Sequence, residues 1–193
     1  MKIRNFFKHL HTINKHRRIV RHICFKIGIP FRGLVHDLSK YSPSEFIPSV
    51  KYFTDGKRSP TEEERAHLGY SSCWLHHKGR NKHHFEYWYD VGHYNKEGVI
   101  QILPIKMPYK YAIECFCDML GASKAYTGSS WEPIQLWRYW CDRTKPEFKI
   151  HKDTESLLEM LFSKLVELGE KEFYKFYKKN KKLIKKNYKE GSK

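Results

Sequence analysis

The sequence predicts an all-α fold, a compact helical bundle, and three observations support this prediction. Apolar residues recur at three- and four-residue spacing along most of the chain, which is typical of amphipathic helices, and almost no stretch alternates as a half-buried strand does. Ser-Pro steps and glycines divide these stretches at helix length. A chain of 193 residues, 40% of them hydrophobic, is long enough for one domain with a core.

The first predicted helix covers residues 5–27. Its apolar positions have mixed three- and four-residue spacing, and Gly28 and Pro30 end it. A short second helix is expected over residues 31–38. The apolar residues of the first helix are Phe6, Leu10, Ile13, Ile19, Val20, Ile23 and Cys24.

Two Ser-Pro steps predict the starts of the next helices. Ser42 is expected to cap a helix whose first residue is Pro43, with Glu45 in the first turn, where the helix dipole stabilises an acidic side chain. The Ser59-Pro60 step has the same form, and we expect the helix after it to run to about residue 78.

The second half of the chain predicts three more helices. Residues 90–107 lack clear periodicity and are expected to form a loop, with a short strand as the alternative. A helix should cover residues 108–126, and an aromatic-rich one should cover residues 131–141. Residues 154–168 have a single apolar stripe, and Gly169 should break or loosen the helix before the lysine-rich end.

Almost all of the net charge of +16 lies at the two ends of the chain. Residues 1–22 carry seven Lys or Arg and no acid, and residues 171–193 carry ten Lys and two Glu, whereas residues 23–170 are nearly neutral at +1. We therefore divide the chain into a helical domain, 1–170, and a lysine-rich C-terminal helix or tail, 171–193. The basic ends could bind nucleic acid or anionic lipid weakly, with a solvated surface as the alternative.

Cysteine usage and hydropathy bear on the location of the protein. The five cysteines are odd in number and form no CxxC pair, so we expect reduced, mostly buried thiols in a cytoplasmic protein. No signal peptide is visible, and no run of about 18 apolar residues could span a membrane. The sequence leaves the oligomeric state open. The cysteines are Cys24, Cys73, Cys115, Cys117 and Cys141.

The stretch WLHHKGRNKHHFEYW, residues 74–88, is rich in possible ligands. His76 and His77 form one pair, and His83 and His84 form another. The cations between the pairs suit phosphate better than metal, because they repel metal ions and pair with anions. His83 and His84 could therefore bind metal or, when protonated, phosphate. The polar residues between the pairs are Lys78, Arg80, Asn81 and Lys82.

Another ligand pair lies upstream, in GLVHDLSKYSPSEF, residues 33–46. His36 and Asp37 are adjacent, and Lys40 follows them. An imidazole beside a carboxylate can bind one divalent ion, and the second carboxylate oxygen can bridge to another ion. This pair is therefore a candidate nucleus for a metal site.

Asp118 is a third candidate ligand, within ECFCDMLGASKAY. Its neighbours on the predicted helix are largely apolar, so we expect the carboxylate to be partly buried. A buried carboxylate needs a cation or hydrogen-bond donors. A metal ion could fill that need, and a salt bridge to Lys124 or Arg138 is the alternative.

The order of the possible ligands, H…HD…H…HH…D, resembles that of the HD-domain superfamily of metal-dependent phosphohydrolases. HDLSK is similar to the HD-x-x-K form of that superfamily, and DMLGA is similar to the helix with its last aspartate. The blocks HDLSKYSPSEF, GYSSCWLHHKGRNKHHFEYW and MPYKYAIECFCDMLGASKAY also resemble a family of small proteins with no established function. Some of these carry the label "catalase", which no haem-ligand arrangement supports here.

The superfamily resemblance implies an HD-domain-like helical bundle with a catalytic domain over residues 1–170. It also implies one or two divalent ions, which could be Mn, Fe, Co, Ni, Zn or Mg. His11 and His22 are alternatives to His16 on the first helix. The implied metal ligands are His16, His36, Asp37, His76, His77 and Asp118.

Helix geometry limits the role of the later histidines. His76 and His77 point about 100° apart on a helix, so we expect one of them to bind the ion and the other to orient it. His67 lies nine residues before His76 and would face away from it on one continuous helix. A break at Gly69 would remove that objection.

The expected function is hydrolysis of a nucleotide or related phosphate ester by metal-activated water. Asp37, Lys40 and His77 are the expected catalytic residues. One alternative is a non-catalytic protein that binds a phosphate ligand or nucleic acid on the same scaffold. Another is a di-iron oxygenase, because the HD scaffold also hosts such enzymes. The expected phosphate contacts are Lys40, Lys78, Arg80, Asn81, Lys82 and Lys124.

Overall fold

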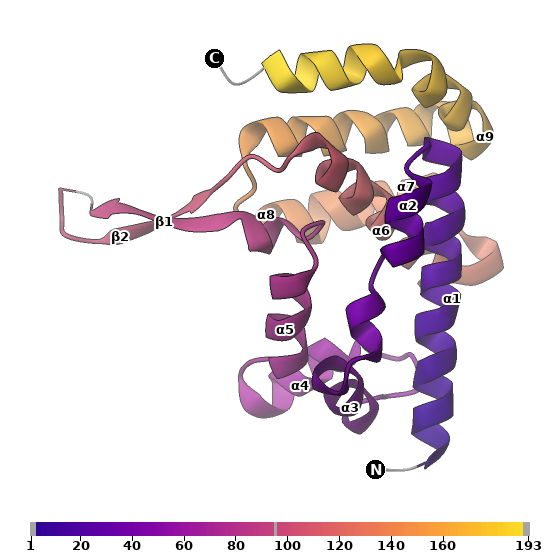
Figure 1. The fold of residues 1–193 in the computed structure, drawn as a ribbon, viewed down its shortest axis with the longest axis vertical. Coiled ribbons are helices and arrows are strands. Elements are labelled where there is room, and N and C mark those ends of the chain that lie inside the picture. The colour runs from indigo at the N-terminus through magenta and orange to yellow at the C-terminus, as the bar shows by residue number, and fades with distance from the viewer. Residues whose placement is uncertain (1–2, 95, 191–193) are drawn as a thin grey trace.

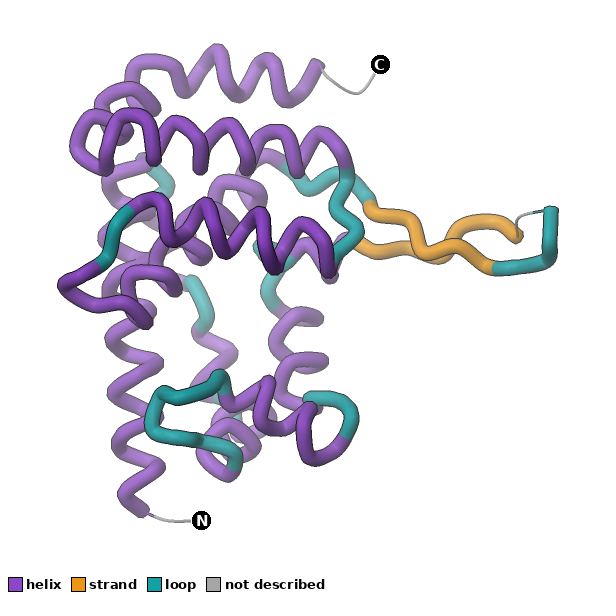
Figure 2. Tube along the Cα trace, turned by 180° about the vertical axis from the view of Figure 1, so that it is seen from behind, coloured by secondary structure: helices purple, strands orange, loops and turns teal. Residues whose placement is uncertain are grey.

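The computed structural model describes residues 3–94 and 96–190, and this part of the chain is built mainly of helices (Figures 1 and 2). The prediction of an all-α fold is confirmed, with one small two-stranded sheet added to it. None of the helices described is both long enough and apolar enough to cross a membrane. All five cysteines are unpaired thiols, and four of them are buried.

The first helix, α1 (Ile3–Ile27), runs along one side of the molecule (Figure 1). It agrees with the helix predicted over residues 5–27. Its inward face includes Val20 and Ile23, both almost fully buried. The helix ends where Gly28 adopts a φ of 80°, a conformation that glycine reaches without steric cost.

The helix expected over residues 31–38 is shorter than predicted. α2 (Pro30–Val35) ends just before His36, because the next residue, Asp37, adopts the left-handed conformation with φ 54° and ψ 27°. A right-handed helix cannot continue through that conformation. A 3-10 turn, Leu38–Tyr41, follows.

α3 (Pro43–Lys51) begins at the predicted proline. Ser42 occupies the cap position, but its hydroxyl forms no cap hydrogen bond with the helix, contrary to the prediction. Glu45 lies in the first turn as expected, yet it is buried, with 1% of its surface exposed. A carboxylate in that position needs donors, and Glu45 finds them in two histidines of a later helix.

The single helix expected after Ser59-Pro60 is two helices, so that prediction is wrong. α4 (Pro60–Leu68) ends at Gly69, which adopts a φ of 78°, and α5 (Ser72–Arg80) follows it. A left-handed glycine is a common helix stop, because it has no Cβ to clash with the backbone. The Ser71 hydroxyl caps α5 by accepting a hydrogen bond from a backbone N–H.

The segment 90–107 contains most of a β-hairpin rather than a loop. A 3-10 turn, Phe85–Trp88, leads into β1 (Tyr89–Tyr94), which pairs antiparallel with β2 (Ile100–Pro104). The hairpin projects away from the helices (Figures 1 and 2). Apolar residues lie on both of its faces, so the sequence lacks the alternation that identifies a strand. Its exposed apolar residues include Val91, Tyr94, Ile100, Ile102 and Leu103.

α6 (Tyr109–Thr127) agrees with the helix predicted over residues 108–126, and eight of its residues are buried. The aromatic helix expected over residues 131–141 is shorter, because its regular turns stop at Tyr139 and the backbone widens into a π-helical turn. The elements after α6 are a 3-10 turn (Gly128–Ser130), α7 (Pro133–Tyr139), the π-helical turn (Trp140–Thr144) and α8 (Lys145–Glu147).

The last helix, α9 (Lys152–Glu190), reverses direction at Gly169, whose φ of 69° and ψ of 163° are not helical. Its two segments lie antiparallel, with the second in yellow in Figure 1. Thr154 and Tyr188, near the outer ends of the two segments, are joined by a hydrogen bond of 3.0 Å between their hydroxyls. The apolar stripe predicted over residues 154–168 is confirmed. Its buried members include Leu157, Leu158, Leu161, Phe162 and Leu165.

The second segment of α9 lies within the lysine-rich stretch 171–193 and supplies residues to the core. Phe173 and Tyr177 have 0% and 1% of their surface exposed. Lys181 Nζ donates to two carbonyls at the end of α1, one of them that of Ile27 at 3.2 Å. This segment is therefore an integral part of the helical packing, and its other face is lined with exposed lysines.

Two hydrophobic clusters hold the helices together. The larger joins α1, α6, α7 and α9, and the smaller joins α1 to α3. Along α1, Ile13 belongs to the smaller cluster and Val20 to the larger, so the residues between them lie where the clusters meet. Gly121 lets α6 pack directly against α1, because a Cβ at this position would collide with the Val20 side chain.

Candidate metal centre

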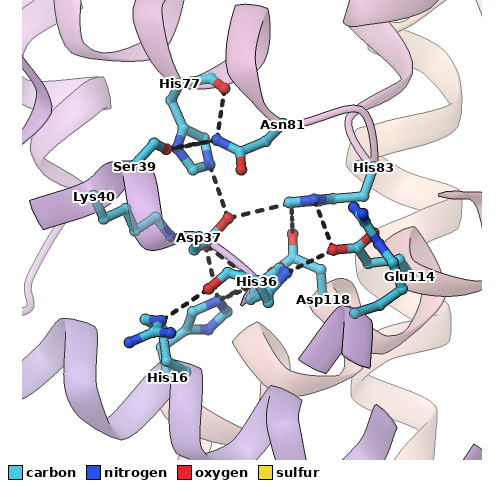
Figure 3. Close-up of polar contacts among 12 residues, drawn as sticks. His16, His36, Asp37, Ser39, Lys40, His77, Asn81, His83, Glu114 and Asp118 are labelled. Carbon is cyan, nitrogen blue, oxygen red and sulfur yellow. Dashed lines mark hydrogen bonds and ion pairs between the residues drawn. The ribbon is translucent and has the colours of Figure 1, made fainter. Parts of the chain in front are cut away.

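Four of the predicted ligands meet where the two clusters join (Figure 3). His16 comes from α1, His36 and Asp37 from the break after α2, and Asp118 from α6. His16 Nε2 lies 3.0 Å from Asp118 Oδ1 and 3.5 Å from Asp37 Oδ2. His36 Nε2 lies 3.2 Å from Asp118 Oδ1 and 3.3 Å from Asp37 Oδ2. We name these residues the first ligand group; one potential ligand atom of each lies within 4.8 Å of the others.

A second ligand group shares Asp37 with the first and adds His77, His83 and His84, again with potential ligand atoms within 4.8 Å of one another. His77 Nε2 and His83 Nε2 each lie 3.4 Å from Asp37 Oδ1. Asp37 therefore presents Oδ2 to the first group and Oδ1 to the second (Figure 3). This division suits a carboxylate that bridges two ions.

The backbone at Asp37 explains how its carboxylate reaches this position. The left-handed conformation, with φ 54°, ends α2 and redirects the chain, and aspartate is among the few residues that adopt it readily. The side chain of Asp37 is left buried, with 1% of its surface exposed. Lys40 follows three residues later, and its Nζ lies 2.6 Å from Asp37 Oδ2.

Several buried polar atoms of the second group form no hydrogen bond, although some lie within ion-pair distance of a charged group. Such atoms are costly in a protein interior and are therefore uncommon. A divalent cation would satisfy carboxylate oxygens and imidazole lone pairs together, so the residues present fit a metal ion. The atoms concerned are both carboxylate oxygens of Asp37, Nε2 of His77, both ring nitrogens of His83, and Nε2 of His84.

The two aspartates are held in their ionised forms. Burial raises the pKa of Asp37, but the positive charges of His36, Lys40 and His77 outweigh this effect and hold that pKa well below its usual range. Burial likewise raises the pKa of Asp118, and the contacts with neighbouring imidazoles lower it well below the usual range. Both carboxylates are therefore in the form that binds a cation.

Two of the histidines differ in protonation. Burial lowers the pKa of His36, but Asp37 and Asp118 raise it well above its usual value, so an ion must displace a proton from this ring. Burial and the neighbouring histidines lower the pKa of His84 well below its usual value, which leaves the His84 ring neutral. A neutral imidazole is the form that binds metal.

Two buried glutamates contact the far sides of the histidine rings. Glu114 Oε1 lies 3.4 Å from both His36 Nδ1 and His83 Nδ1. Glu45 accepts a hydrogen bond of 2.7 Å from His77 Nδ1 and a second of 2.7 Å from His76 Nδ1. Each glutamate thus faces the nitrogen opposite the one that points to Asp37, which is the usual arrangement around metal-binding histidines.

Not every predicted metal ligand joins the cluster. His16, His36, Asp37, His77 and Asp118 are brought together, and the carboxylate of Asp118 faces imidazoles rather than the cations suggested as alternatives. His76 belongs to neither ligand group, and its ring contacts Glu45 as the ring of His77 does, which agrees with the expectation that only one of the pair binds the ion. The other histidines considered are exposed and lie apart from the site: His11, His22 and His67.

Some of the predicted phosphate contacts lie at the site, and others do not. Lys40 lies at the cluster, and Asn81 lies beside it, where its Nδ2 donates to Ser39 Oγ at 2.7 Å and to the His77 carbonyl at 2.8 Å. Lys124 is not brought to the site, because its Nζ forms a 2.6 Å ion pair with Glu170. Among the described residues, no hydrogen bond or ion pair joins either ligand group to Lys78, Arg80 or Lys82.

The sequence did not identify Glu114 or Glu45 as members of the site. Glu114 precedes Asp118 by four residues on a helix, which places both on one face, and this spacing was the available signal. The sequence explains Glu45 through the helix dipole alone. It leaves the roles of His83 and His84 open, and in the structure the chain departs from the helical conformation after Arg80, where periodicity no longer fixes direction.

The fold and the two ligand groups define a predominantly helical protein with a buried, histidine-rich candidate metal centre. The chain belongs to a family of unknown function, DUF5662, which it matches over residues 5–164. All residues of both ligand groups lie within the matched range. No curated protein and no solved structure matches the chain.

Proposed function

We propose that the protein is a metal-dependent phosphohydrolase that acts on a nucleotide or related phosphate ester. The observation that carries the proposal is the sharing of Asp37 between two ligand groups, each with potential ligand atoms within 4.8 Å of one another. The order of the first group along the chain, H…HD…D, supports it through the resemblance to the HD superfamily. That resemblance also favours phosphate esters as the substrate class.

The ligand groups assign a role to each side chain. His16, His36 and Asp118 would hold a first ion, the three histidines of the second group would hold another, and Asp37 would contribute to both. A divalent ion bound in such a site acidifies water and polarises a phosphate ester. Mixed nitrogen and oxygen ligands suit Mn, Fe, Co, Ni or Zn, whereas a closed structural zinc site would favour cysteine.

The exposure of the side chains supports an approach of the substrate from one edge of the centre. Lys40, Asp118 and His16 have 30%, 15% and 12% of their side-chain surface exposed, whereas His36 and Asp37 have 0% and 1%. The ester therefore enters along the edge that carries Lys40. Its ammonium donates to a non-bridging phosphoryl oxygen and stabilises the charge that develops in the transition state.

The test combines metal analysis with an activity panel. The purified chain is analysed for bound metals by mass spectrometry, reloaded with Mn²⁺ or Fe²⁺, and assayed with phosphomonoesters, phosphodiesters and nucleotides. Asp37→Asn is the informative variant, because asparagine also adopts the left-handed backbone and preserves the shape of the side chain. We expect this variant to lose bound metal and turnover while keeping its helical circular dichroism spectrum.

His67→Ala is the matched control. His67 is exposed on α4, and among the described residues its polar and ring contacts are with Glu63 on the same helix and with Tyr52. Its removal should therefore leave metal content and turnover at wild-type values. Wild-type metal content and turnover in Asp37→Asn would refute the proposal. A wild-type chain that holds metal but hydrolyses no ester in the panel would refute the phosphohydrolase assignment and leave the metal centre intact.

The second candidate function is non-catalytic binding of nucleic acid. It is favoured by the second segment of α9, whose buried stripe packs on the core while its opposite face exposes lysines with few acids among them. Such a face suits sequence-independent contacts with phosphates. The exposed lysines are Lys171, Lys175, Lys178, Lys179, Lys182, Lys185, Lys186 and Lys189.

Charge reversal on this face tests the second candidate. Lys178, Lys182 and Lys185 share one side of the helix, and replacing all three by Glu should weaken binding to labelled duplex DNA and reduce the salt slope by about 3. The control replaces three exposed lysines elsewhere, Lys57, Lys96 and Lys149, by Glu and so has the same net charge. Equal loss in both variants, or binding to anionic vesicles but not to DNA, would exclude this candidate.

A further inference from the structure

We propose that Glu114 is a positioning residue that couples the two ligand groups, so that both ions depend on one carboxylate. This inference rests on the metal centre of the proposed function, but not on the phosphohydrolase reaction. Glu114 binds no substrate in this scheme. It acts through the imidazole rings of His36, in the first group, and His83, in the second.

The geometry around Glu114 carries the proposal (Figure 3). Its Oε1 lies 3.4 Å from Nδ1 of His36 and 3.4 Å from Nδ1 of His83. The opposite nitrogens, Nε2, lie 3.3 Å from Asp37 Oδ2 and 3.4 Å from Asp37 Oδ1, respectively. His36 Nδ1 is hydrogen-bonded to this oxygen, whereas His83 Nδ1 lies within ion-pair distance of it but forms no hydrogen bond. A carboxylate beside Nδ1 favours the tautomer with its proton there and leaves the Nε2 lone pair for an ion.

Glu114 is itself fixed in place. It has 0% of its surface exposed, and Arg32 donates from Nε to its Oε2 at 2.6 Å while a second guanidinium nitrogen contacts the same oxygen at 2.5 Å. The guanidinium thus engages one oxygen and leaves the other for the two imidazoles.

Two other buried glutamates provide matched comparisons. Glu45 contacts His77, which belongs to the second group, and His76, which belongs to neither. Glu64 accepts hydrogen bonds from two serine hydroxyls and a backbone N–H at the start of α5, with no histidine among its partners. Glu114 thus contacts histidines of both ligand groups, Glu45 contacts a histidine of one group, and Glu64 contacts no histidine of either group. All three glutamates are buried.

The experiment measures ion binding rather than activity. The full chain is stripped of metal with a chelator and titrated with Mn²⁺ by calorimetry, with stoichiometry checked by mass spectrometry and folding checked by circular dichroism. Wild type should bind two ions. Glu114→Gln should weaken both sites by about 10- to 100-fold, the usual effect of removing such a partner. Glu45→Gln should weaken one site only, and Glu64→Gln should leave both unchanged.

Arg32→Lys is the second variant and decides the question if Glu114→Gln does not fold. It keeps a positive charge but loses the two-point contact of the guanidinium, so it should weaken both ions by a smaller factor. Loss of one ion only, or wild-type affinities, in Glu114→Gln (or in Arg32→Lys if the first variant does not fold) would overturn the proposal. So would a wild-type chain that binds fewer than two ions.

The failure of this inference can be told apart from the failure of the proposed function. If both sites weaken in Glu114→Gln and the wild type hydrolyses no phosphate ester, the coupling role stands and the phosphohydrolase assignment fails. If the wild type hydrolyses an ester and binds two ions that are unaffected in Glu114→Gln, the assignment stands and the coupling role fails.

Discussion

Asp37 is the residue on which both ligand groups depend. Its side chain is almost completely buried, its two oxygens face different groups, and its backbone conformation ends the helix before it. Without a cation, the carboxylate has Lys40 as its closest charged partner, at 2.6 Å. The same lysine is the most exposed side chain at the centre, so it can face both Asp37 and an incoming anion.

Lys40 should therefore contribute to substrate affinity more than to ion binding. A hydrogen bond to a charged group is worth about 1.5–3 kcal/mol, so Lys40→Met should lower kcat/KM for a phosphate ester by roughly 10- to 100-fold. Metal content should remain at the wild-type value. Lys51→Met, on the solvent side of α3, is the control and should leave kcat/KM unchanged. Wild-type kcat/KM in Lys40→Met would contradict this role.

The metal-free protein should lose stability in acid partly through Glu114. The pKa of this carboxyl is about 2 in the folded chain, against an ordinary 4.5. This depressed pKa stabilises the fold at pH values above the unfolded-state pKa of 4.5. The stabilisation is lost as the pH falls from 4.5 to about 2. The contribution is about 3 kcal/mol at 1.36 kcal/mol per pKa unit.

Urea unfolding of the metal-free protein between pH 6 and pH 2.5 measures this contribution. Glu114→Gln should be less stable than wild type near pH 6, and the difference should shrink toward pH 2.5. Asp37 and Asp118 also titrate in acid, but they are present in both proteins, so the difference reports on Glu114. A difference that stays constant with pH would show that the carboxylate charge is not what stabilises the fold.

The order of ligand types was enough to predict that His36, Asp37 and Asp118 converge, because that order follows a recurring pattern. It could not assign His76 and His77. Two adjacent helical residues point in different directions. Glu45 contacts both rings, and the packing of the helices around Asp37 decides which ring turns inward. Contacts between helices carry no local sequence signal, so this part of the site required the three-dimensional arrangement.

At the scale of elements, the crossing of α1 and α6 determines the spacing of the first ligand group. His16 lies one turn before Val20 on α1, and Asp118 lies one turn before Gly121 on α6. The absence of a side chain at Gly121 lets the helices approach until His16 Nε2 and Asp118 Oδ1 are 3.0 Å apart. Close helix packing is therefore a requirement of the site.

Gly121→Ala should destabilise the fold and weaken one ion. The added Cβ would collide with the side chain of Val20, and such overpacking costs about 1–3 kcal/mol. Gly79→Ala on α5 is the control, because nothing lies within 4 Å of its Cβ position and alanine favours a helix by about 0.5–1 kcal/mol. Thermal unfolding should place the two variants on opposite sides of wild type, and Mn²⁺ titration should show weaker binding in Gly121→Ala only. The same direction of change in both would refute the packing argument.

Elements with regular periodicity were predicted well, and those that depend on single residues were not. α1 and α6 have long apolar stripes that fix their bounds to within a few residues. The stop at Gly69 is only an alternative in the sequence, because glycine is also tolerated inside helices and its left-handed conformation is not visible there. A strand in the hairpin is likewise only an alternative, because its exposed apolar residues follow no alternation.

At the scale of the whole molecule, the matched family range and the packed fold do not end at the same place. The family match stops at residue 164, whereas the core continues through the reversal at Gly169 into the second segment of α9. Tyr188 donates a hydrogen bond to the carbonyl of Met107, just before α6. The last segment is therefore needed to complete the packing around the helix that carries Asp118.

Deletion of residues 171–193 should abolish cooperative folding. The deletion removes Phe173, Tyr177, Ile184 and Tyr188 from the core, and losing one large buried side chain costs about 2–5 kcal/mol. For four side chains this is about 8–20 kcal/mol, which is comparable to or larger than the roughly 5–15 kcal/mol that stabilises a typical domain. Circular dichroism and urea unfolding would detect the loss, whereas the full chain with substituted lysines should unfold as wild type does. A cooperative transition in the truncated chain would contradict this expectation.

The contact between Lys181 and Ile27 has a consequence for how the protein is made. The two residues are 154 positions apart, and at about 5–20 residues per second α1 emerges well before its partner is synthesised. Contacts between distant segments form late, because a long loop must close first. We therefore expect folding to finish only after translation. The ion-binding residues, all synthesised earlier, would reach their final geometry in the last step.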